Sequence, residues 1–194
     1  MDICFATNNA HKVREINQLL GERFRMLSLA DIGCQEELPE NQTTLEGNSE
    51  EKASYVYQHY RVNCFADDTG LEVDALQGEP GVYSARYAGP QRSSEDNMRR
   101  LLRELADQPN RTAQFRTVIT LWLDGQMHQF EGMVSGSIAR ERSGSEGFGY
   151  DPIFIPEGFT RSFADMTAEE KNQISHRGRA IRRLVQFLET YPQQ

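Results

Sequence analysis

Ala66-Asp67-Asp68-Thr69-Gly70-Leu71-Glu72-Val73-Asp74-Ala75-Leu76 places two adjacent carboxylates between hydrophobic residues. The apolar run 62–66 stops at the first carboxylate, and apolar and polar residues alternate after the Thr-Gly pair. This pattern predicts a strand, a sharp turn at Thr-Gly and a second strand. Carboxylates at the end of a strand are held rigidly and stay open to ligand, as in many catalytic and metal sites. A solvated acidic turn fits the same residues, so the rest of the chain must decide.

Length and composition predict a globular protein with a single domain over residues 1–194. The chain is 38% hydrophobic and 26% charged, and apolar periodicity recurs along its whole length. No apolar run approaches the roughly 20 residues of a membrane span. The N-terminus lacks the basic and apolar regions of a signal peptide. We therefore expect a cytoplasmic protein without a membrane partner.

The net charge of −8 argues against a nucleic-acid partner, because nucleic-acid binding needs a basic surface. A small anionic ligand remains compatible with this charge, since it needs only a few Lys and Arg or a divalent cation. Cys4, Cys34 and Cys64 are odd in number and widely spaced, which predicts neither a disulfide framework nor a zinc site. Cys4 and Cys64 are expected as small core residues.

The first 21 residues predict a strand, a polar loop and a helix. Residues 3–6 are apolar, Thr7-Asn8-Asn9-Ala10 interrupts them, and Val13 and Ile16 then recur at helical spacing up to a C-terminal cap at Gly21. A helix N-terminus after such a loop can bind phosphate through its backbone N–H groups. Lys12 lies beside the positive end of this helix, where an anion would offset its charge. A solvated Lys12 near Glu15 is the ordinary alternative.

A short strand at 24–27 is followed by an acidic segment, and a helix is expected to begin near Thr44 or Leu45 and to run to Tyr60. Lys52 has no acidic residue at helical spacing, so no salt bridge within the helix explains it. It therefore faces either solvent or a ligand.

The next segments predict that part of the sheet is antiparallel. Ser94 is a candidate N-cap for a helix. Alternation over 113–121 predicts a strand with at least one wet face, and Asp124-Gly125 predicts a hairpin with a return strand over 126–134. A purely parallel sheet is therefore not expected.

A second dense stretch lies at 144–152, Gly-Ser-Glu-Gly-Phe-Gly-Tyr-Asp-Pro. It matches neither the dinucleotide fingerprint nor the P-loop. Its glycines allow a close approach of the backbone, and Phe148 is available to stack on a flat ligand, although a glycine-rich turn with a core Phe is an equal alternative. Downstream, Thr167 and Glu170 form a capping box, and His176-Arg177 between two helices can bind a base or a phosphate or simply cap a helix.

The order of these motifs resembles the inosine triphosphate pyrophosphatase family, also called dITP/XTP pyrophosphatases. The resemblance extends from residue 2 to about residue 188. The motifs that carry it are Thr7-Asn8-Asn9 with Lys12, Asp67-Asp68-Thr69-Gly70, Pro80-Gly81-Val82-Tyr83-Ser84-Ala85-Arg86, Gly147-Phe148-Gly149-Tyr150-Asp151-Pro152 and Ser175-His176-Arg177-Gly178.

The resemblance implies an α/β fold with a mixed twisted sheet, flanking helices and two lobes around a central nucleotide cleft. It implies a homodimer and a Mg²⁺-dependent hydrolysis of ITP, dITP and XTP to the monophosphate and pyrophosphate, which clears deaminated purines from the nucleotide pool. Asp68 matches the general base and a metal ligand, and Glu40 matches a metal-binding carboxylate. The substrate-binding residues implied in the same way are Thr7, Asn8, Asn9, Ala10, His11, Lys12, Lys52, Thr69, Phe148, Gly149, Tyr150, Asp151, Lys171, His176 and Arg177. No role is assigned to Asp67.

The chain departs from the family pattern at three places. Many relatives have Thr-Gly-Asn at Thr7-Asn8-Asn9, and the turn of the family also occurs with Ser at Thr69. Many bacterial relatives have Glu-Asn at Gly47-Asn48, and the missing carboxylate makes the metal assignment depend more on Glu40. Two alternatives stay open: a pyrophosphatase that prefers modified pyrimidines, and a nucleotide sensor that has lost catalysis. Phe148 and His176-Arg177 argue against the first, and the presence of Lys12, Glu40 and Asp68 argues against the second.

Overall fold

The structure is a computed structural model that describes residues 1–20 and 24–191. Its strands are β1 (Asp2–Phe5), β2 (Arg25–Leu27), β3 (Cys64–Val73), β4 (Pro80–Gly81), β5 (Thr112–Leu123), β6 (Gln126–Ile138) and β7 (Phe154–Pro156). Its α-helices are α1 (Ala10–Leu20), α2 (Leu45–Tyr60), α3 (Ser94–Glu104), α4 (Ala168–Ile174) and α5 (His176–Thr190). The predicted cap Gly21 lies outside the described residues.

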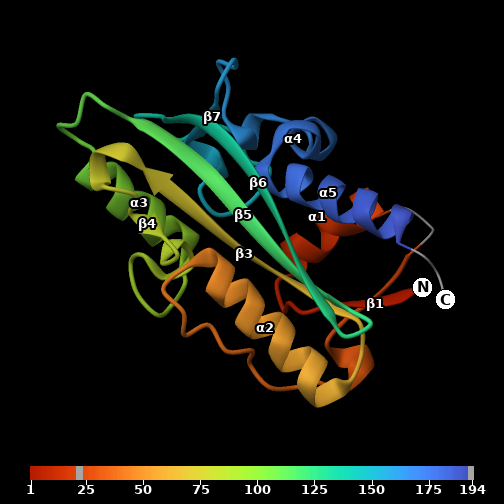
Figure 1. Ribbon diagram of the computed structural model, residues 1–194. Coiled ribbons are helices and arrows are strands. Elements are labelled where there is room, and N and C mark those ends of the chain that lie inside the picture. Colours follow the sequence, from red (N-terminus) through yellow and green to blue (C-terminus); the bar gives the residue numbers. More distant parts are fainter. Residues whose placement is uncertain (21–23, 192–194) are drawn as a thin grey trace. The chain divides into compact units, whose positions relative to one another are not determined.

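The strands form a mixed sheet in the order β2-β1-β3-β5-β6-β7, and β4 pairs with β3. β1 pairs in parallel with β2 and β3, with Cys4 opposite Cys64. β3–β4 and β6–β7 are antiparallel. The predicted α/β class with a mixed sheet and flanking helices is therefore confirmed (Figure 1).

Strand β3 runs without interruption through the two carboxylates, so the predicted turn at Thr69-Gly70 is wrong. Strand pairing holds the backbone on both sides of Thr69-Gly70, because Phe65 pairs with β1 and Leu71 pairs with β4. Glycine is tolerated inside a strand when pairing fixes the backbone on both sides. Turn propensity was therefore overridden by strand pairing.

The chain divides into two compact units. Unit 1 contains the described residues of Met1–Asp68, those of Thr117–Gly132, and those from Arg177 onward; unit 2 contains Thr69–Arg116 and Met133–His176. The division falls within strands β3, β5 and β6 and at the start of α5. The single domain over 1–194 stays a prediction.

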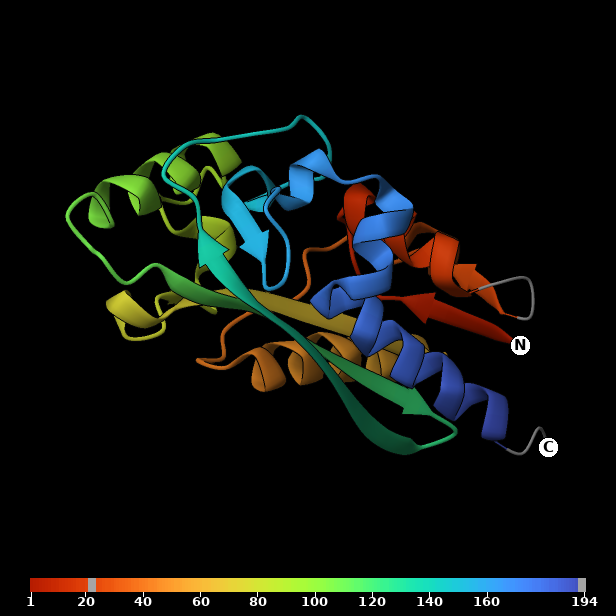
Figure 2. The same cartoon turned by 90° about the horizontal axis from the view of Figure 1, so that it is seen from above.

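In unit 1, helices cover both faces of the strands. Alternate residues of β1 and β3 point to opposite faces, and two hydrophobic clusters follow this alternation. Helix α2 covers one face, and α1 and α5 cover the other (Figures 1 and 2). The first cluster includes Cys4, Ala6, Cys64, Ala66, Ala53 and Val56, and the second includes Ile3, Phe5, Phe65, Ile16, Ile181 and Leu184.

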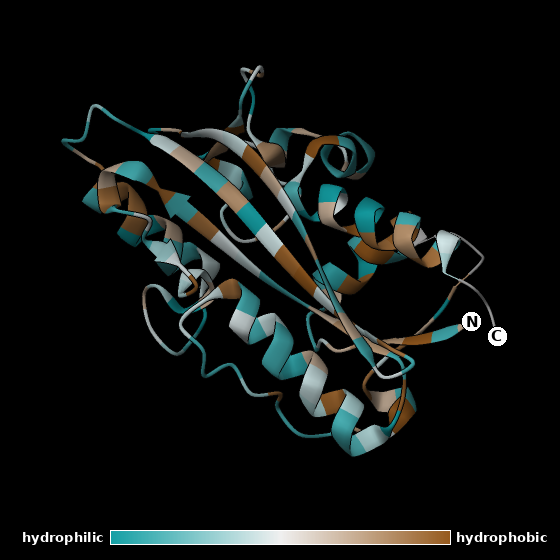
Figure 3. Cartoon of the chain, viewed as in Figure 1, coloured by the Kyte–Doolittle hydropathy of each residue, from teal (hydrophilic) through white to brown (hydrophobic). Residues whose placement is uncertain are grey.

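Each helix of unit 1 buries only part of its circumference, so hydrophobic and hydrophilic residues are mixed along it (Figure 3). Helix α2 begins where predicted, and its N-cap Thr44 accepts a hydrogen bond from the Gly47 N–H at 3.0 Å. Residues 117–121 of strand β5 are all buried, so both faces of the strand are covered in this segment. The predicted wet face is wrong for this segment.

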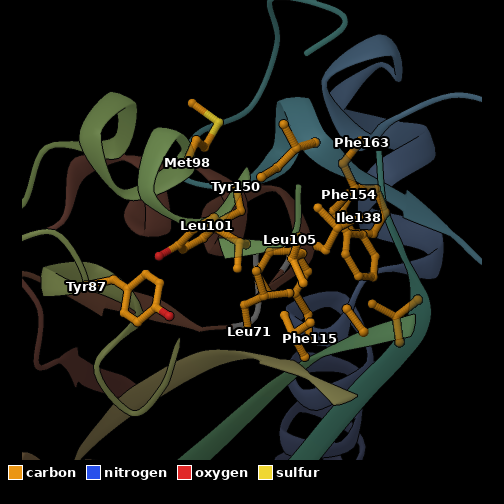
Figure 4. Packing of buried hydrophobic residues seen from close by; sticks show 14 of the residues in the cluster. Leu71, Tyr87, Met98, Leu101, Leu105, Phe115, Ile138, Tyr150, Phe154 and Phe163 are labelled. Atoms are coloured by element: carbon orange, nitrogen blue, oxygen red, sulfur yellow. The ribbon is translucent and has the colours of Figure 1, made fainter. Parts of the chain in front are cut away.

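Unit 2 has its own core, in which Phe115, Phe154 and Phe163 pack together (Figure 4). Helix α3 contributes its apolar stripe to this core. The N-cap of α3 is Ser93, whose side chain accepts from the Asp96 N–H at 3.2 Å; the predicted Ser94 is the first helical residue.

Three local predictions are confirmed. Asp124 and Gly125 both have positive φ, as a tight hairpin between β5 and β6 requires. Thr167 and Glu170 form the capping box of α4. Cys4 and Cys64 are buried core residues. None of the helices within residues 1–20 and 24–191 has the length and hydropathy needed to cross a bilayer.

Gly136→Ala tests the pairing of β6 with β7. A Cβ at this position would lie 2.3 Å from the Ile155 carbonyl oxygen. We expect the free energy of unfolding in urea to fall by about 1–3 kcal/mol, the usual cost of overpacking. The exposed Ser135→Ala on the same strand is the control, with an expected change within about 0.5 kcal/mol. Equal stabilities of the two variants would contradict this packing.

Candidate active site

Strand β3 sends its two carboxylates in opposite directions. Asp67 follows Phe65 toward the face covered by α1 and α5, and Asp68 follows Ala66 toward the face covered by α2. This alternation gives the two neighbours different partners. We use the term charged cluster for the group in unit 1 formed by Lys12, Glu15, Glu40, Asn48, Lys52, Asp67, Asp68 and Arg177.

Asp67 forms ion pairs with two basic side chains. Lys12 Nζ lies 2.8 Å from Asp67 Oδ1, and Arg177 Nε lies 3.4 Å from Oδ2. The Asp67 side chain has no exposed area, and Arg177 also pairs with Glu15. Burial raises the pKa of Asp67, but Lys12, Arg177 and Lys52 together outweigh burial and hold this pKa well below its usual range. Asp67 is therefore an ionised counter-charge.

Asp68 has a more basic carboxylate than its neighbour. Asn48 Nδ2 donates to Asp68 Oδ2 at 3.1 Å, and Lys52 Nζ lies 3.6 Å from Oδ1. Burial raises the pKa of Asp68, and Lys52, Lys12 and Asn48 offset this effect only in part. Of the two carboxylates, Asp68 is thus the better proton acceptor.

Lys52 joins Asp68 to the loop that carries Glu40. Its Nζ lies 2.8 Å from Glu40 Oε1 and donates to the Asp67 main-chain oxygen at 2.8 Å. Burial lowers the pKa of Lys52, but the nearby carboxylates outweigh it and raise this pKa overall. The ammonium group is therefore charged.

The residues that follow Glu40 in its loop are held to helix α2 by hydrogen bonds. Glu51 accepts from the Asn41 backbone N–H at 2.7 Å and from the Asn41 side chain at 3.1 Å. Asn48 Oδ1 accepts from the Gln42 N–H at 2.9 Å while its amide donates to Asp68. Asn48 therefore sets the distance between the loop and Asp68.

The predicted phosphate loop surrounds the start of α1. Asn9 Oδ1 accepts from the His11 N–H at 3.0 Å and from the Lys12 N–H at 3.3 Å, and Thr7 Oγ1 accepts from the Asn9 N–H at 3.2 Å. Asn8, Ala10 and His11 are exposed. Lys12 reaches the charged cluster through its ion pair with Asp67.

In unit 2, the glycine-rich stretch folds around Asp151. The carboxylate Oδ2 accepts from the Phe148 N–H at 2.8 Å and from Lys171 Nζ at 2.6 Å. A Cβ on Gly147, which has φ 73°, would lie 2.1 Å from this oxygen. The close approach expected at the glycines is thus made here by a side chain of the protein itself.

Phe148 is the half-buried aromatic residue of this stretch, and Lys171 Nζ lies 5.0 Å from the centre of its ring. Tyr150 OH donates to the Ser84 carbonyl at 2.8 Å. His176 is buried and stacks on Phe115 with ring centres 4.5 Å apart. Gly149 has φ 63°, and Thr69 is half-buried in unit 2.

The structure thus gathers the predicted residues into two groups. Lys12, Glu40, Lys52, Asp68 and Arg177 share the charged cluster of unit 1, and Phe148, Asp151, Lys171 and His176 belong to unit 2. Glu15 and Asn48 were not expected as members of the charged cluster, and no role was predicted for Asp67. The period-two alternation of residues 64–68 is the signal that separates Asp67 from Asp68.

Comparison with known proteins identifies the family. The model of the Ham1 family matches residues 3–187. The chain is 54% identical over 187 residues to a dITP/XTP pyrophosphatase of Flavobacterium psychrophilum, covering 96% of this chain and 98% of that protein.

Comparison with solved structures points to the same family. The Ham1 protein of Staphylococcus aureus has a TM-score of 0.89 and 38% sequence identity, covering 97% of this chain and 98% of that one. A HAM1 protein of Coxiella burnetii has a TM-score of 0.91 and 33% identity, covering 98% and 100%. The chain therefore belongs to the Ham1 family.

Proposed function

We propose that this chain is a nucleoside triphosphate pyrophosphatase that hydrolyses ITP, dITP and XTP to the monophosphate and pyrophosphate. Its relatives bear the name of this activity. The observation that carries the proposal is the pair of adjacent carboxylates in β3, of which one is a counter-charge and the other has a raised pKa. Such a pair provides a fixed charge and a base in one short stretch.

Asp68 acts as the general base. It accepts a proton from the attacking water while the oxygen of that water bonds to phosphorus and the anhydride P–O bond breaks, releasing pyrophosphate. Its raised pKa makes it a stronger base than an exposed aspartate. Lys12 and Lys52 bind the triphosphate, and residues 7–11 surround it at the start of α1.

Glu40 and Asp68 would hold Mg²⁺. Their carboxylates meet at one cation, because Lys52 Nζ contacts both, so the donor set fits a small hard ion. Mg²⁺ characteristically takes one or two carboxylates and completes its shell with water and substrate phosphate. No larger group of Asp, Glu, His or Cys arranged for a metal occurs in the described part of the chain. The bound ion would neutralise charge on the phosphate oxygens.

Residues of unit 2 bind the base of the nucleotide. Phe148 stacks on the purine, supported by Lys171 and Asp151. Tyr150, His176, Gly149 and Thr69 complete this set by resemblance to the family. A donor aimed at O6 and an acceptor aimed at N1–H would reject ATP, since the reversed donor and acceptor pattern of adenine leaves these polar groups unpaired. The homodimer and the cytoplasmic location are part of the same proposal.

Pyrophosphate release across ITP, dITP, XTP, ATP, GTP and dTTP tests the activity. We expect release from the first three with Mg²⁺, at least about 100-fold slower release from ATP, and none after EDTA. Preferential cleavage of dTTP would instead favour a pyrimidine enzyme. Binding of ITP without any release would favour a sensor.

Asp68→Asn removes the base while keeping the size of the side chain. We expect kcat to fall by at least about 100-fold, the usual contribution of a general base, while ITP still binds in a calorimeter. Near-full activity of this variant would place the base elsewhere.

The pH profile tests how Asp68 is tuned. The value of kcat/KM should fall as pH drops through the pKa of Asp68 in the free enzyme, and this acid limb should lie above the usual range of an aspartate because burial raises the pKa. Asn48→Ala removes a donor that favours the charged form, so the limb of kcat/KM should move to higher pH.

Glu51→Gln is the matched control for this profile, because it loosens the Glu40 loop without touching Asp68. Its acid limb should coincide with that of the wild type. Equal displacement in both variants would assign the effect to the loop.

A further inference from the structure

Lys52 lies where the proposed metal would bind. Its ammonium group is 2.8 Å from Glu40 Oε1 and 3.6 Å from Asp68 Oδ1, and the residue is only 6% exposed. A third oxygen, the Asp67 carbonyl, accepts from the same nitrogen at 2.8 Å. The ammonium therefore has an oxygen environment like that of a small cation.

A divalent ion and this ammonium cannot share the two carboxylates. Mg²⁺ binds oxygen at about 2.0–2.1 Å, so an ion between Glu40 and Asp68 would occupy the space of Nζ. The two cations would also repel each other in a buried site, where screening by water is weak. One of them must leave when the other binds.

The charges of the cluster favour the lysine while no nucleotide is bound. Lys12, Lys52 and Arg177 face four carboxylates, namely Glu15, Glu40, Asp67 and Asp68. The cluster is therefore almost neutral without a metal. A divalent ion alone is therefore attracted only weakly by the cluster as a whole. A bound triphosphate, in contrast, supplies the anion that Lys52 needs when its ammonium leaves the carboxylates.

We infer that Lys52 is a resident counter-ion that holds the place of the divalent cation until the nucleotide arrives. This inference rests on the proposed metal site. Transfer of the Lys52 ammonium from Glu40 and Asp68 to a phosphate opens the carboxylates to the metal. Metal and triphosphate consequently strengthen each other's binding, and the coupling is reciprocal.

Binding of Mn²⁺ to the nucleotide-free protein, followed by electron paramagnetic resonance of the free ion, tests the inference. Lys52→Met removes the ammonium and keeps most of the volume of the side chain. We expect it to bind Mn²⁺ at least about tenfold more tightly than the wild type. Weaker or unchanged binding would overturn the inference.

Lys12→Met is the matched control. It removes the same charge from the same cluster, but Lys12 pairs with Asp67 and not with Glu40 or Asp68. We expect a gain of less than about threefold. Equal gains in Mn²⁺ affinity in the two variants would show a general effect of charge. They would overturn the inference that Lys52 in particular occupies the metal position.

Failure of the metal site is distinguishable from failure of the inference. Glu40→Gln added to Lys52→Met should abolish the gain; if the gain persists, the ion binds elsewhere and the proposed metal site is wrong. If Glu40→Gln weakens Mn²⁺ binding to the complex with a non-hydrolysable ITP analogue but Lys52→Met gives no gain, only the inference fails.

Folding of the variants needs its own measurement, because Lys52→Met leaves two carboxylates without their cation. Lys52→Gln, which keeps a hydrogen-bond donor, is the second variant. Mn²⁺ should raise the Tm of either variant more than that of the wild type, since a ligand of the folded state stabilises it. No difference in this rise would also contradict the inference.

Discussion

Two consecutive carboxylates inside a covered strand impose the constraint on which the rest of unit 1 depends. An ionised carboxylate away from water is costly unless cations and donors surround it. The pleat of β3 turns Asp67 and Asp68 to opposite faces, so each face needs its own partners. Helices α1 and α5 provide Lys12 and Arg177 on one side, and α2 provides Asn48 and Lys52 on the other. Charge compensation therefore fixes which residues these helices present to the sheet.

The two carboxylates consequently differ in chemistry although they are neighbours. Asp67 is surrounded by cations and stays ionised, whereas Asp68 has partners that only partly offset its burial. Glu40 joins Asp68 through a loop whose position is set by hydrogen bonds to α2. Helix α2 thus supports the loop, orients the proposed base and carries the ammonium that contacts both acids. A small shift of α2 would alter all three functions together.

Much of the fold was predictable because its signals are local. Apolar periodicity, the Asp124-Gly125 turn and the capping box of α4 each require only a few adjacent residues. The turn at Thr69-Gly70 was wrong because pairing with distant strands decides whether a glycine bends the chain. The site was harder to predict from the sequence for the same reason. Asp67 meets Lys12 and Arg177 across sequence separations of 55 and 110 residues, and no local pattern reveals such partners.

The three cysteines of unit 1 have a practical consequence. Burial raises the pKa of Cys4 to about 12 and also raises the pKa of Cys64, and Cys34 is buried with them. Alkylating reagents must reach the sulfur and attack it as the thiolate, so Cys4 and Cys64 are protected by burial and by their raised pKa values, and Cys34 is protected by burial. A cysteine introduced at an exposed position can therefore carry a spectroscopic label without removal of the native ones. Later modification of the native thiols would then report the opening of unit 1 alone.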